Sequence, residues 1–187
     1  MLISGGRFSA ALLALITIRA VTTLLTPEQY GELALLVAVQ MFCGLFLVNP
    51  VGQHINLHTH AWWDDGTLMA RLKSYRNYVF AVSIVGGLVA LGLSKQNTVE
   101  QMLWTALAMF TMVAAGTWNA TLIPMLNMLG FRAASVVWSI ITVAISLTSS
   151  ILLVAWQPSA NAWFAGQSIG MVIGALGARY FLGRNVV

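Results

Sequence analysis

Long runs of apolar residues, separated by short polar stretches, make up most of this chain. A helix needs roughly 20 apolar residues to cross the hydrocarbon core of a bilayer. Only structures that satisfy their own backbone hydrogen bonds are stable there, so each run is read as a helix. The pattern predicts six transmembrane helices, at about 8–25, 31–58, 77–94, 101–126, 134–156 and 162–182.

These six helices use almost the whole chain, so we expect residues 1–187 to form one membrane bundle without a soluble domain. The first run follows Arg7 and has the outline of a signal peptide. Arg19 interrupts that run, however, and no clean small-residue cleavage site follows. We therefore expect a retained first transmembrane helix.

Composition agrees with this fold class. Hydrophobic residues make up 59% of the chain and charged residues 7%, whereas soluble domains carry about 25% charged residues. The expected fold is therefore all-α and integral to a membrane. The single cysteine, Cys43, lies in the middle of a predicted helix, so neither a disulfide framework nor redox chemistry is indicated.

The basic residues predict the orientation of the bundle, because Lys and Arg beside transmembrane helices are retained on the cytoplasmic side. With both termini in the cytoplasm, only Lys95 lies outside and Arg19 lies within the membrane. The remaining basic residues are then cytoplasmic: Arg7, Arg71, Lys73, Arg76, Arg132, Arg179 and Arg184. Topology thus explains the formal net charge of +4, and nucleic-acid binding is not indicated.

All the histidines lie in the stretch HINLHTH, residues 54–60. On a helix His54 and His58 share a face, as two ligands of a metal ion would. His60 points away from that pair at about 100° per residue, so a third ligand would have to come from Asp64, Asp65 or another helix. We expect polar histidines that face water near the membrane interface, and neither a metal site nor a cofactor.

Polar side chains inside the apolar runs form three groups. In a membrane such residues either pack helices together or face a wet cavity, and both readings stay open. The groups are Ser135, Ser139, Thr142, Ser146 and Ser149 in the run 134–156; Asn49, Gln53, Asn56 and His60 in the run 31–58; and Thr117, Asn119 and Thr121 before Pro124. Packing is favoured for the hydroxylated stripe, and less so for the amides, which are larger and need partners.

Glycines recur at intervals of four in the last run, at Gly166, Gly170 and Gly174, with Gly177 beyond them. Small residues at this spacing let two helices approach closely. We expect this face of the helix to pack against a neighbour.

Arg19 is the strongest single candidate for function. A guanidinium inside a membrane is unfavourable unless it reaches the interface, water or an anion. The long side chain of Arg19 can snorkel to the interface. The alternative is that it lines a cavity that receives an anion, most naturally a phosphate.

The junction between the first two predicted helices reads RAVTTLLTPEQYGELALL. Thr26 can cap the second helix, Pro27 suits its first position, and Gln29 can complete a capping box. This turn resembles the helix 1–helix 2 junction of polysaccharide and O-antigen flippases of the Wzx type, in the multidrug/oligosaccharidyl-lipid/polysaccharide exporter superfamily. Two further stretches resemble the inner end of helix 2 and the basic turn between helices 4 and 5 of those flippases: NPVGQHINLHTH and LNMLGFRAAS.

The resemblance implies that a polyprenyl-diphosphate-linked oligosaccharide is moved from the inner to the outer leaflet of the bacterial cytoplasmic membrane. It implies alternating access through a cationic central cavity and no covalent chemistry, so we do not expect an enzyme. Arg19 resembles a cavity arginine of helix 1, and the basic start of the third helix would attract the diphosphate or, alternatively, contact anionic lipids. The candidate substrate-binding residues are Arg19, Gln53, Asn56, Asn119, Arg71, Lys73 and Arg76.

Those flippases contain two six-helix bundles, and the resemblance covers only the N-terminal one. A single bundle lacks the opposing wall that alternating access requires. We therefore expect either a truncated fragment or a protein that assembles, as a parallel homodimer or with a separate C-terminal half.

Two other classes stay open. One is a non-transporting membrane subunit that scaffolds a glycan-assembly complex. The other is a lipid-modifying membrane enzyme, which would need a nucleophile or a metal at the interface. Its catalytic candidates would be His54, His58 and Asp64–Asp65.

Overall fold

The computed structural model describes residues 15–93 and 98–185, and no strand occurs in these two ranges. The predicted all-α fold is confirmed for this part of the chain. The helices are α2 (Pro27–Phe42), the π-helix η1 (Cys43–Val48), α3 (Asn49–Asp64), α4 (Leu68–Leu93), α5 (Val99–Met128), α6 (Arg132–Trp156) and α7 (Ala160–Asn185), preceded by the helical segment Leu15–Leu24. Arg7, the first part of the predicted helix 8–25, and Lys95 lie outside the described residues.

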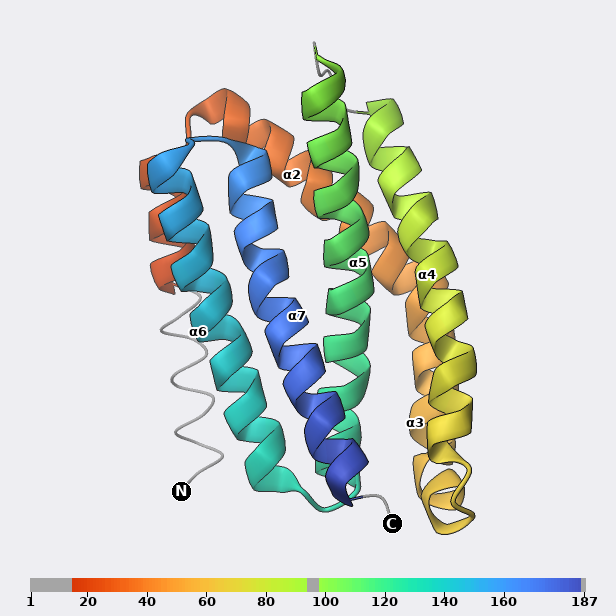
Figure 1. Cartoon of the computed structure of the whole chain (residues 1–187). Helices are drawn as coiled ribbons and strands as arrows, with labels where there is room; N and C mark the ends of the chain where they lie inside the picture. The colour runs from red at the N-terminus through yellow and green to blue at the C-terminus, as the bar shows by residue number, and fades with distance from the viewer. Residues whose placement is uncertain (1–14, 94–97, 186–187) are drawn as a thin grey trace.

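The four long helices α4 to α7 run up and down beside one another, and α2 crosses behind them obliquely (Figure 1). From the end of α2 the chain continues through α3 along α4 to the lower end of the bundle. The α3–α4 turn, the α5–α6 turn and the end of α7 all lie at this lower end. The basic residues near these three points are therefore grouped at one end of the bundle: Arg71, Lys73, Arg76, Arg132 and Arg184.

The segments α2, η1 and α3 form one uninterrupted helical run, Pro27–Asp64, of 38 residues. At 1.5 Å per residue the run is about 57 Å long, which exceeds the roughly 30 Å of a hydrocarbon core. The run changes direction between α2 and α3, where η1 and Pro50 lie (Figure 1). Both a π-helical segment and a proline are recognised causes of helix bending.

The turn before α2 has the capping geometry that its sequence predicts. The Thr26 hydroxyl accepts a hydrogen bond from the Gln29 backbone N–H at 3.4 Å, and the Gln29 side-chain oxygen accepts one from the Thr26 N–H at 3.3 Å. Pro27 occupies the first turn, so the predicted capping box is confirmed. The Gln29 side-chain nitrogen also donates to the carbonyl of Pro158 and ties the start of α2 to the α6–α7 turn.

Two turns at the lower end of the bundle depend on glycine. Gly66 has φ 68° and Gly130 has φ 91°, in the left-handed region that favours glycine. After Gly66, α4 begins at Leu68, before the start at about residue 77 that the apolar run predicts. The helix α4 therefore also contains the basic residues that precede the apolar run at 77–94.

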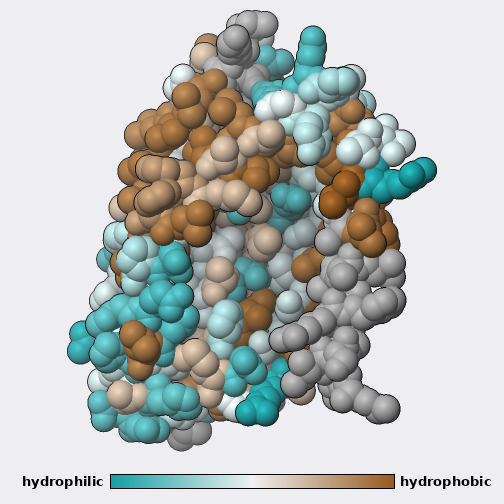
Figure 2. All heavy atoms as spheres, turned by 180° about the vertical axis from the view of Figure 1, so that it is seen from behind, coloured by the Kyte–Doolittle hydropathy of each residue, from teal (hydrophilic) through white to brown (hydrophobic). Residues whose placement is uncertain are grey.

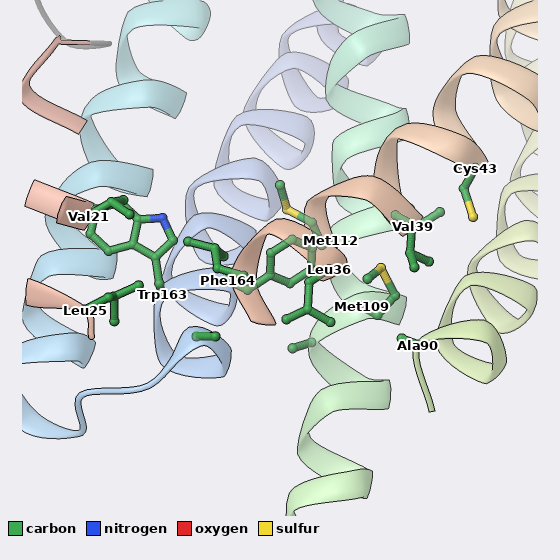
Figure 3. Close-up of a cluster of buried hydrophobic side chains, with 14 of the residues drawn as sticks. Val21, Leu25, Leu36, Val39, Cys43, Ala90, Met109, Met112, Trp163 and Phe164 are labelled. Carbon is green, nitrogen blue, oxygen red and sulfur yellow. The ribbon is translucent and has the colours of Figure 1, made fainter. Parts of the chain in front are cut away.

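A buried apolar cluster attaches the oblique α2 to the long helices. Leu36 and Val39 of α2 pack with Met109 and Met112 of α5 and with Phe164 of α7 (Figure 3). A second buried cluster joins α3, α4, α5 and α7 nearer the lower end: Ile55, Leu72, Leu122, Met125 and Leu182. These two clusters determine where η1 and α3 lie relative to α5.

The closest helix pair is α6 and α7. A Cβ atom added at Gly166, Gly170 or Gly174 would overlap atoms of α6, including the backbone of Ser146 and Ser150. Gly177 leaves room for the Trp138 ring in the same way. The prediction that these glycines form a close-packing face is confirmed.

By length and composition, four described helical segments are able to cross a membrane: Pro27–Asp64, Leu68–Leu93, Val99–Met128 and Arg132–Trp156. The 26-residue α7 is also long, but it is less apolar than these four. Of the first predicted helix, the described part Leu15–Leu24 is short. The number of six membrane-crossing helices therefore stays a prediction.

Candidate functional site

A cavity of about 570 Å³ lies between the run α2–η1–α3 and α5, and it is partly open to the surface. Its volume falls in the range of about 300–1,000 Å³ that is typical of small-molecule sites. No charged side chain belongs to the lining that the described residues form. Most of the polar lining consists of amide side chains: Gln40, Asn49, Gln53, Asn56 and Asn119.

The π-helix η1 brings amides from two helical segments to one wall. Asn49 follows Gln40 by nine residues, and at about 100° per residue a regular α-helix would place the two on opposite faces. In η1 the Asn49 backbone N–H donates to the carbonyl of Gly44, five residues back. The chain therefore turns less per residue in η1 than in an α-helix, and Gln40 and Asn49 both line the cavity.

A contact from α4 accompanies this irregular segment. The Tyr78 hydroxyl donates a hydrogen bond to the carbonyl of Leu47, inside η1. Backbone carbonyls in a non-standard helical turn need such external donors when their regular partners are displaced. Tyr78 therefore helps to hold η1 in the conformation that shapes the cavity.

The α5 wall of the cavity is held by hydrogen bonds to neighbouring helices. The Asn119 side-chain nitrogen donates to the Thr142 hydroxyl of α6 at 3.1 Å. The hydroxyls of Thr121 and Tyr75 lie 3.3 Å apart, and Thr121 donates to the carbonyl of Thr117 at 2.9 Å. These bonds fix the orientation of the polar side chains on this wall.

The α3 wall contains an acceptor without a donor. The Gln53 side-chain nitrogen donates to Asn49 Oδ1 at 3.4 Å. Asn56 Oδ1, in contrast, is buried and has no hydrogen-bond partner among the described residues. A buried acceptor left unpaired is destabilising by about 1–3 kcal/mol.

The structure brings together three of the candidate substrate-binding residues, Gln53, Asn56 and Asn119, in this cavity. The basic candidates do not line it. Arg71, Lys73 and Arg76 are exposed at the start of α4, where the Arg71 guanidinium lies 5.7 Å from the centre of the Trp62 ring.

Arg19 also lies away from the cavity lining. Its side chain is exposed, in a shallow surface groove formed by residues of its own helix: Leu15, Ile16, Ala20, Thr23 and Leu24. The cationic central cavity that the resemblance implies would lie between two bundles, and it stays a prediction. The cavity within the described residues is a different one, and its polar lining is formed mainly by neutral amides.

Most of the hydroxyl stripe of α6 is used for packing, whereas Ser139 is exposed. Ser146, Ser149 and Ser150 donate hydrogen bonds to carbonyls of α7, and Ser135 donates to the carbonyl of Ile123 in α5 at 2.9 Å. Of the two readings that the sequence left open, packing holds for these residues. The amides of α3, in contrast, line a cavity.

The histidine pair lies on the outer surface of α3. The rings of His54 and His58 share a face as predicted, with centroids 4.3 Å apart, and His58 stacks on Trp62 at 5.4 Å. Both histidines are exposed. Across residues 15–93 and 98–185, no three His, Cys, Asp or Glu side chains come together in a group suited to a metal ion.

Gln40 lines the cavity although the polar groups in the sequence did not single it out. A single amide inside an apolar run is a recognised mark of a polar site in a membrane helix. Five cavity-lining residues also follow one another at intervals of four: Gln40, Gly44, Val48, Gly52 and Asn56. The sequence pattern predicts a polar stripe only from Asn49 onward, because it does not reveal the π-helix that aligns the two parts.

The surface beside the cavity divides into an apolar and a hydrophilic region (Figure 2). Apolar side chains gather in the upper part of this face, where η1 and the end of α2 expose Met41, Phe42, Leu45 and Phe46. Hydrophilic side chains gather below, over α3. The cavity lining runs from Gln40 to Asn56 and therefore passes from the first region into the second.

Comparisons of the chain with protein-family models, curated proteins and solved structures found no match.

Proposed function

We propose that this chain is one half of a membrane transporter of the flippase class that its sequence resembles. In this proposal it moves polyprenyl-diphosphate-linked oligosaccharides across the bacterial cytoplasmic membrane for polysaccharide biosynthesis. Six helices cross the membrane, both termini lie in the cytoplasm, and no bond of the substrate is made or broken.

The observation that carries this proposal is the amide-lined cavity within an apolar helical bundle. Side-chain amides are unfavourable at membrane depth unless they meet water, protein or a ligand. An amide both donates and accepts hydrogen bonds, which suits the hydroxyl groups of a saccharide. The run α2–η1–α3 and α5 present such amides from two sides.

The hydrophilic surface of α3 supports the idea that the chain is a half that assembles. Gln53, His54 and His58 are exposed there, and side chains of this kind do not face lipid tails. We infer that water or protein lies against α3. A second bundle, from another copy of the chain or from a separate C-terminal half, would provide the opposing wall that alternating access needs.

In this proposal the diphosphate contacts basic side chains outside the cavity. Guanidinium groups bind phosphate oxygens through paired, charge-assisted hydrogen bonds. Arg19 on the first helix is one candidate. The basic start of α4 supplies the others, Arg71, Lys73 and Arg76, whose alternative role is contact with anionic lipid headgroups.

Glycan export in a complementation assay tests the proposal. Gly52 lines the cavity, and a Cβ atom there would meet no atom within 4 Å. Gly52→Leu should therefore fill the cavity without disturbing helix packing, and we expect export to be lost. Gly31→Leu is the matched control, because Gly31 also borders open space but does not line the cavity. Normal export by Gly52→Leu, at a normal amount in the membrane, would refute the proposal.

The substitution Arg19→Ala tests whether Arg19 or the basic start of α4 contacts the diphosphate. If Arg19 binds the diphosphate, export should fall while the amount of protein in the membrane stays normal. Export equal to that of the unaltered protein would remove Arg19 from the proposal. The basic residues of α4 would then be the remaining candidates.

A non-transporting subunit of a glycan-assembly complex is the second candidate. The packed α6 stripe favours it, because a scaffold would use its polar residues to join helices. A scaffold predicts that the α3 residues are also shielded from water. A thiol introduced by Gly52→Cys, in a Cys43→Ala background, would then resist a water-soluble thiol reagent, whereas the transporter proposal predicts that it reacts.

The mass of the assembly in lipid nanodiscs tests whether the chain is a functional half. We expect a dimer, or a one-to-one complex when a matching C-terminal half is co-expressed. A strictly monomeric chain that gains no partner would contradict the assembly part of the proposal.

A further inference from the structure

A surface groove lies between the start of α4 and the end of α7, at the basic end of the bundle (Figure 1). We infer that this groove binds the phosphate group of an anionic phospholipid from the surrounding bilayer, and that Arg179 and Arg184 hold the phosphate. The groove shares no lining residue with the amide-lined cavity. The bound lipid is a component of the bilayer and not a transported substrate, so this site is additional to the proposed function.

The groove has a volume of about 460 Å³ and is open to the surface. From α4 it is lined by Met69, and from α7 by Leu176, Arg179, Tyr180, Gly183 and Arg184. The two helices approach closely here, because a Cβ atom added at Gly183 would lie 3.4 Å from the terminal methyl carbon of Met69. The groove therefore offers two guanidinium groups and a phenol hydroxyl beside an apolar surface.

The positive charge of the groove has no acidic counterpart on the helices that form it. Neither α4 nor α7 contains Asp or Glu, and both arginines are exposed. The Arg179 guanidinium lies 6.0 Å from the centre of the Trp118 ring. Such a cation–π contact favours one position of the side chain but does not neutralise its charge. The groove is thus suited to an anion that comes from outside the protein.

More positive charge lies along the same side of α4. Lys73 and Arg76 follow Met69 by four and seven residues, and this spacing places all three on one helix face. Lys73 and Arg76 are exposed. A phosphate in the groove therefore meets positive charge from two helices, which favours a lipid with net negative charge over a zwitterionic lipid.

An exposed apolar stripe on α7 leads to the groove. Its members recur at intervals of four, three and four residues: Ile169, Ile173, Leu176 and Tyr180. This spacing places them on one face of α7, and the last two also line the groove. An acyl chain packed along the stripe would bring its headgroup to the arginines. A soluble phosphate gains nothing from the stripe, because it has no apolar surface to bury.

Tyr180 lies where the stripe meets the basic residues. Tyrosine is enriched at membrane interfaces, where its ring contacts the acyl region and its hydroxyl reaches the headgroups. That hydroxyl is able to donate a hydrogen bond to a phosphate oxygen, and the guanidinium groups form charge-assisted hydrogen bonds with the others. The order of groups along α7 thus matches the order of groups along a phospholipid.

The competing explanation is that Arg179 and Arg184 serve only to orient α7 during membrane insertion. Anionic lipids would then be attracted by the total charge of this end of the bundle, and any one of its basic residues would matter as much as another. Arg132 distinguishes the two explanations. It lies at the same end, at the start of α6, but does not line the groove.

The test uses the full chain in a mild detergent, and native mass spectrometry measures the Kd of added dioleoylphosphatidylglycerol. Two ligands are compared with it: dioleoylphosphatidylcholine, which has no net charge, and glycerol 1-phosphate, which has no acyl chain. We expect phosphatidylglycerol to bind about tenfold more tightly than either. Equal affinity for phosphatidylcholine would mean that charge is not recognised, and equal affinity for glycerol 1-phosphate would mean that the groove is a site for free phosphate. Either result overturns the inference.

Substitution of single arginines tests the headgroup contact. Arg179→Gln and Arg184→Gln should each raise the Kd of phosphatidylglycerol by about fivefold, whereas Arg132→Gln should leave it unchanged. Glutamine is a good helix former, and Arg184 lies in the last turn of α7, so the thermal midpoint without added lipid should stay nearly constant for Arg184→Gln. The inference fails if the groove variants bind like the unaltered protein, or if Arg132→Gln weakens binding as much as they do.

Leu176→Ser tests the acyl-chain contact. Leu176 is 62% exposed and Leu57 of α3 is 81% exposed, so neither substitution should disturb the core, and Leu57→Ser is the matched control. We expect Leu176→Ser to raise the Kd of phosphatidylglycerol by about threefold or more, since less apolar surface is buried against the chain. The same Kd for both variants would rule out the acyl-chain contact and with it the lipid site. Glycan export is not measured here, so the lipid site and the transport proposal are tested separately.

Discussion

The side-chain nitrogen of Asn119 on α5 donates a hydrogen bond to the hydroxyl oxygen of Thr142 on α6, at 3.1 Å. Thr142 in turn donates to the carbonyl of Trp138 at 2.7 Å. Gly174 of α7 packs against this pair so closely that a Cβ atom there would overlap both side chains. One residue of the cavity wall is thereby attached to the packing face between α6 and α7.

This relationship predicts coupling between Asn119 and Thr142. Hydrogen bonds between membrane helices contribute about 0.6 kcal/mol on average and up to about 1.7 kcal/mol. A double-mutant cycle with Asn119→Ala and Thr142→Val should therefore give a coupling energy in this range, measured by unfolding in detergent. Additive effects of the two changes would mean that the bond contributes nothing.

Substitutions of Asn119 and Thr142 should affect export differently, although both remove the same hydrogen bond. Thr142 does not line the cavity, so the proposed transport function predicts that Thr142→Val retains most of the export in a complementation assay. Asn119→Ala removes an amide from the cavity wall as well, and we expect it to reduce export further. Equal export by the two variants would argue against a direct role for Asn119.

The α6–α7 contact should not tolerate a methyl group at Gly170. A Cβ there would overlap the Ser146 side chain and the backbone of α6, and overpacking of this kind destabilises by about 1–3 kcal/mol. Gly170→Ala should therefore lower the thermal midpoint. Gly31→Ala is the matched control in open space, where alanine should stabilise the helix by up to about 1 kcal/mol. Equal midpoints for the two variants would contradict the close packing.

The capping box before α2 should contribute measurably to stability. Thr26→Ala removes the acceptor for the Gln29 N–H, and loss of a threonine cap typically destabilises by about 1 kcal/mol. Thr26→Ser keeps the hydroxyl and should restore most of the loss. Thermal unfolding of the three proteins in detergent provides the comparison. A Thr26→Ala protein as stable as the unaltered one would show that the cap is dispensable.

The two ends of α5 should differ in their access to an impermeant thiol reagent. In a Cys43→Ala background, a thiol introduced by Glu100→Cys should react when the reagent is added outside intact cells. One introduced by Asn127→Cys should react only after lysis. Asn127 is preferable to Gly130 for this purpose, because the φ of 91° at Gly130 would strain any other residue. The reverse labelling pattern would overturn the predicted orientation.

Several features of this protein were determined by the sequence alone, because they depend on neighbouring residues. The helical fold follows from the length of the apolar runs, and the start of α2 follows from the chemistry of Thr26, Pro27 and Gln29. The glycine face of α7 and the shared face of His54 and His58 follow from helical spacing. Each of these needs only the geometry of one regular helix.

The tertiary structure decided which faces meet. No local feature of the sequence distinguishes the α6 stripe from the α3 amides. The α6 stripe packs against α7, whereas the α3 amides line a cavity. To choose between packing and a cavity, one must know which helix lies opposite each group. The same holds for Arg19, whose place outside that lining follows from how its helix packs. Gln40 joins the cavity only because η1 changes the helical turn before Asn49. A π-helix is set by the balance of contacts along a whole helix, so its position is visible only in the folded chain.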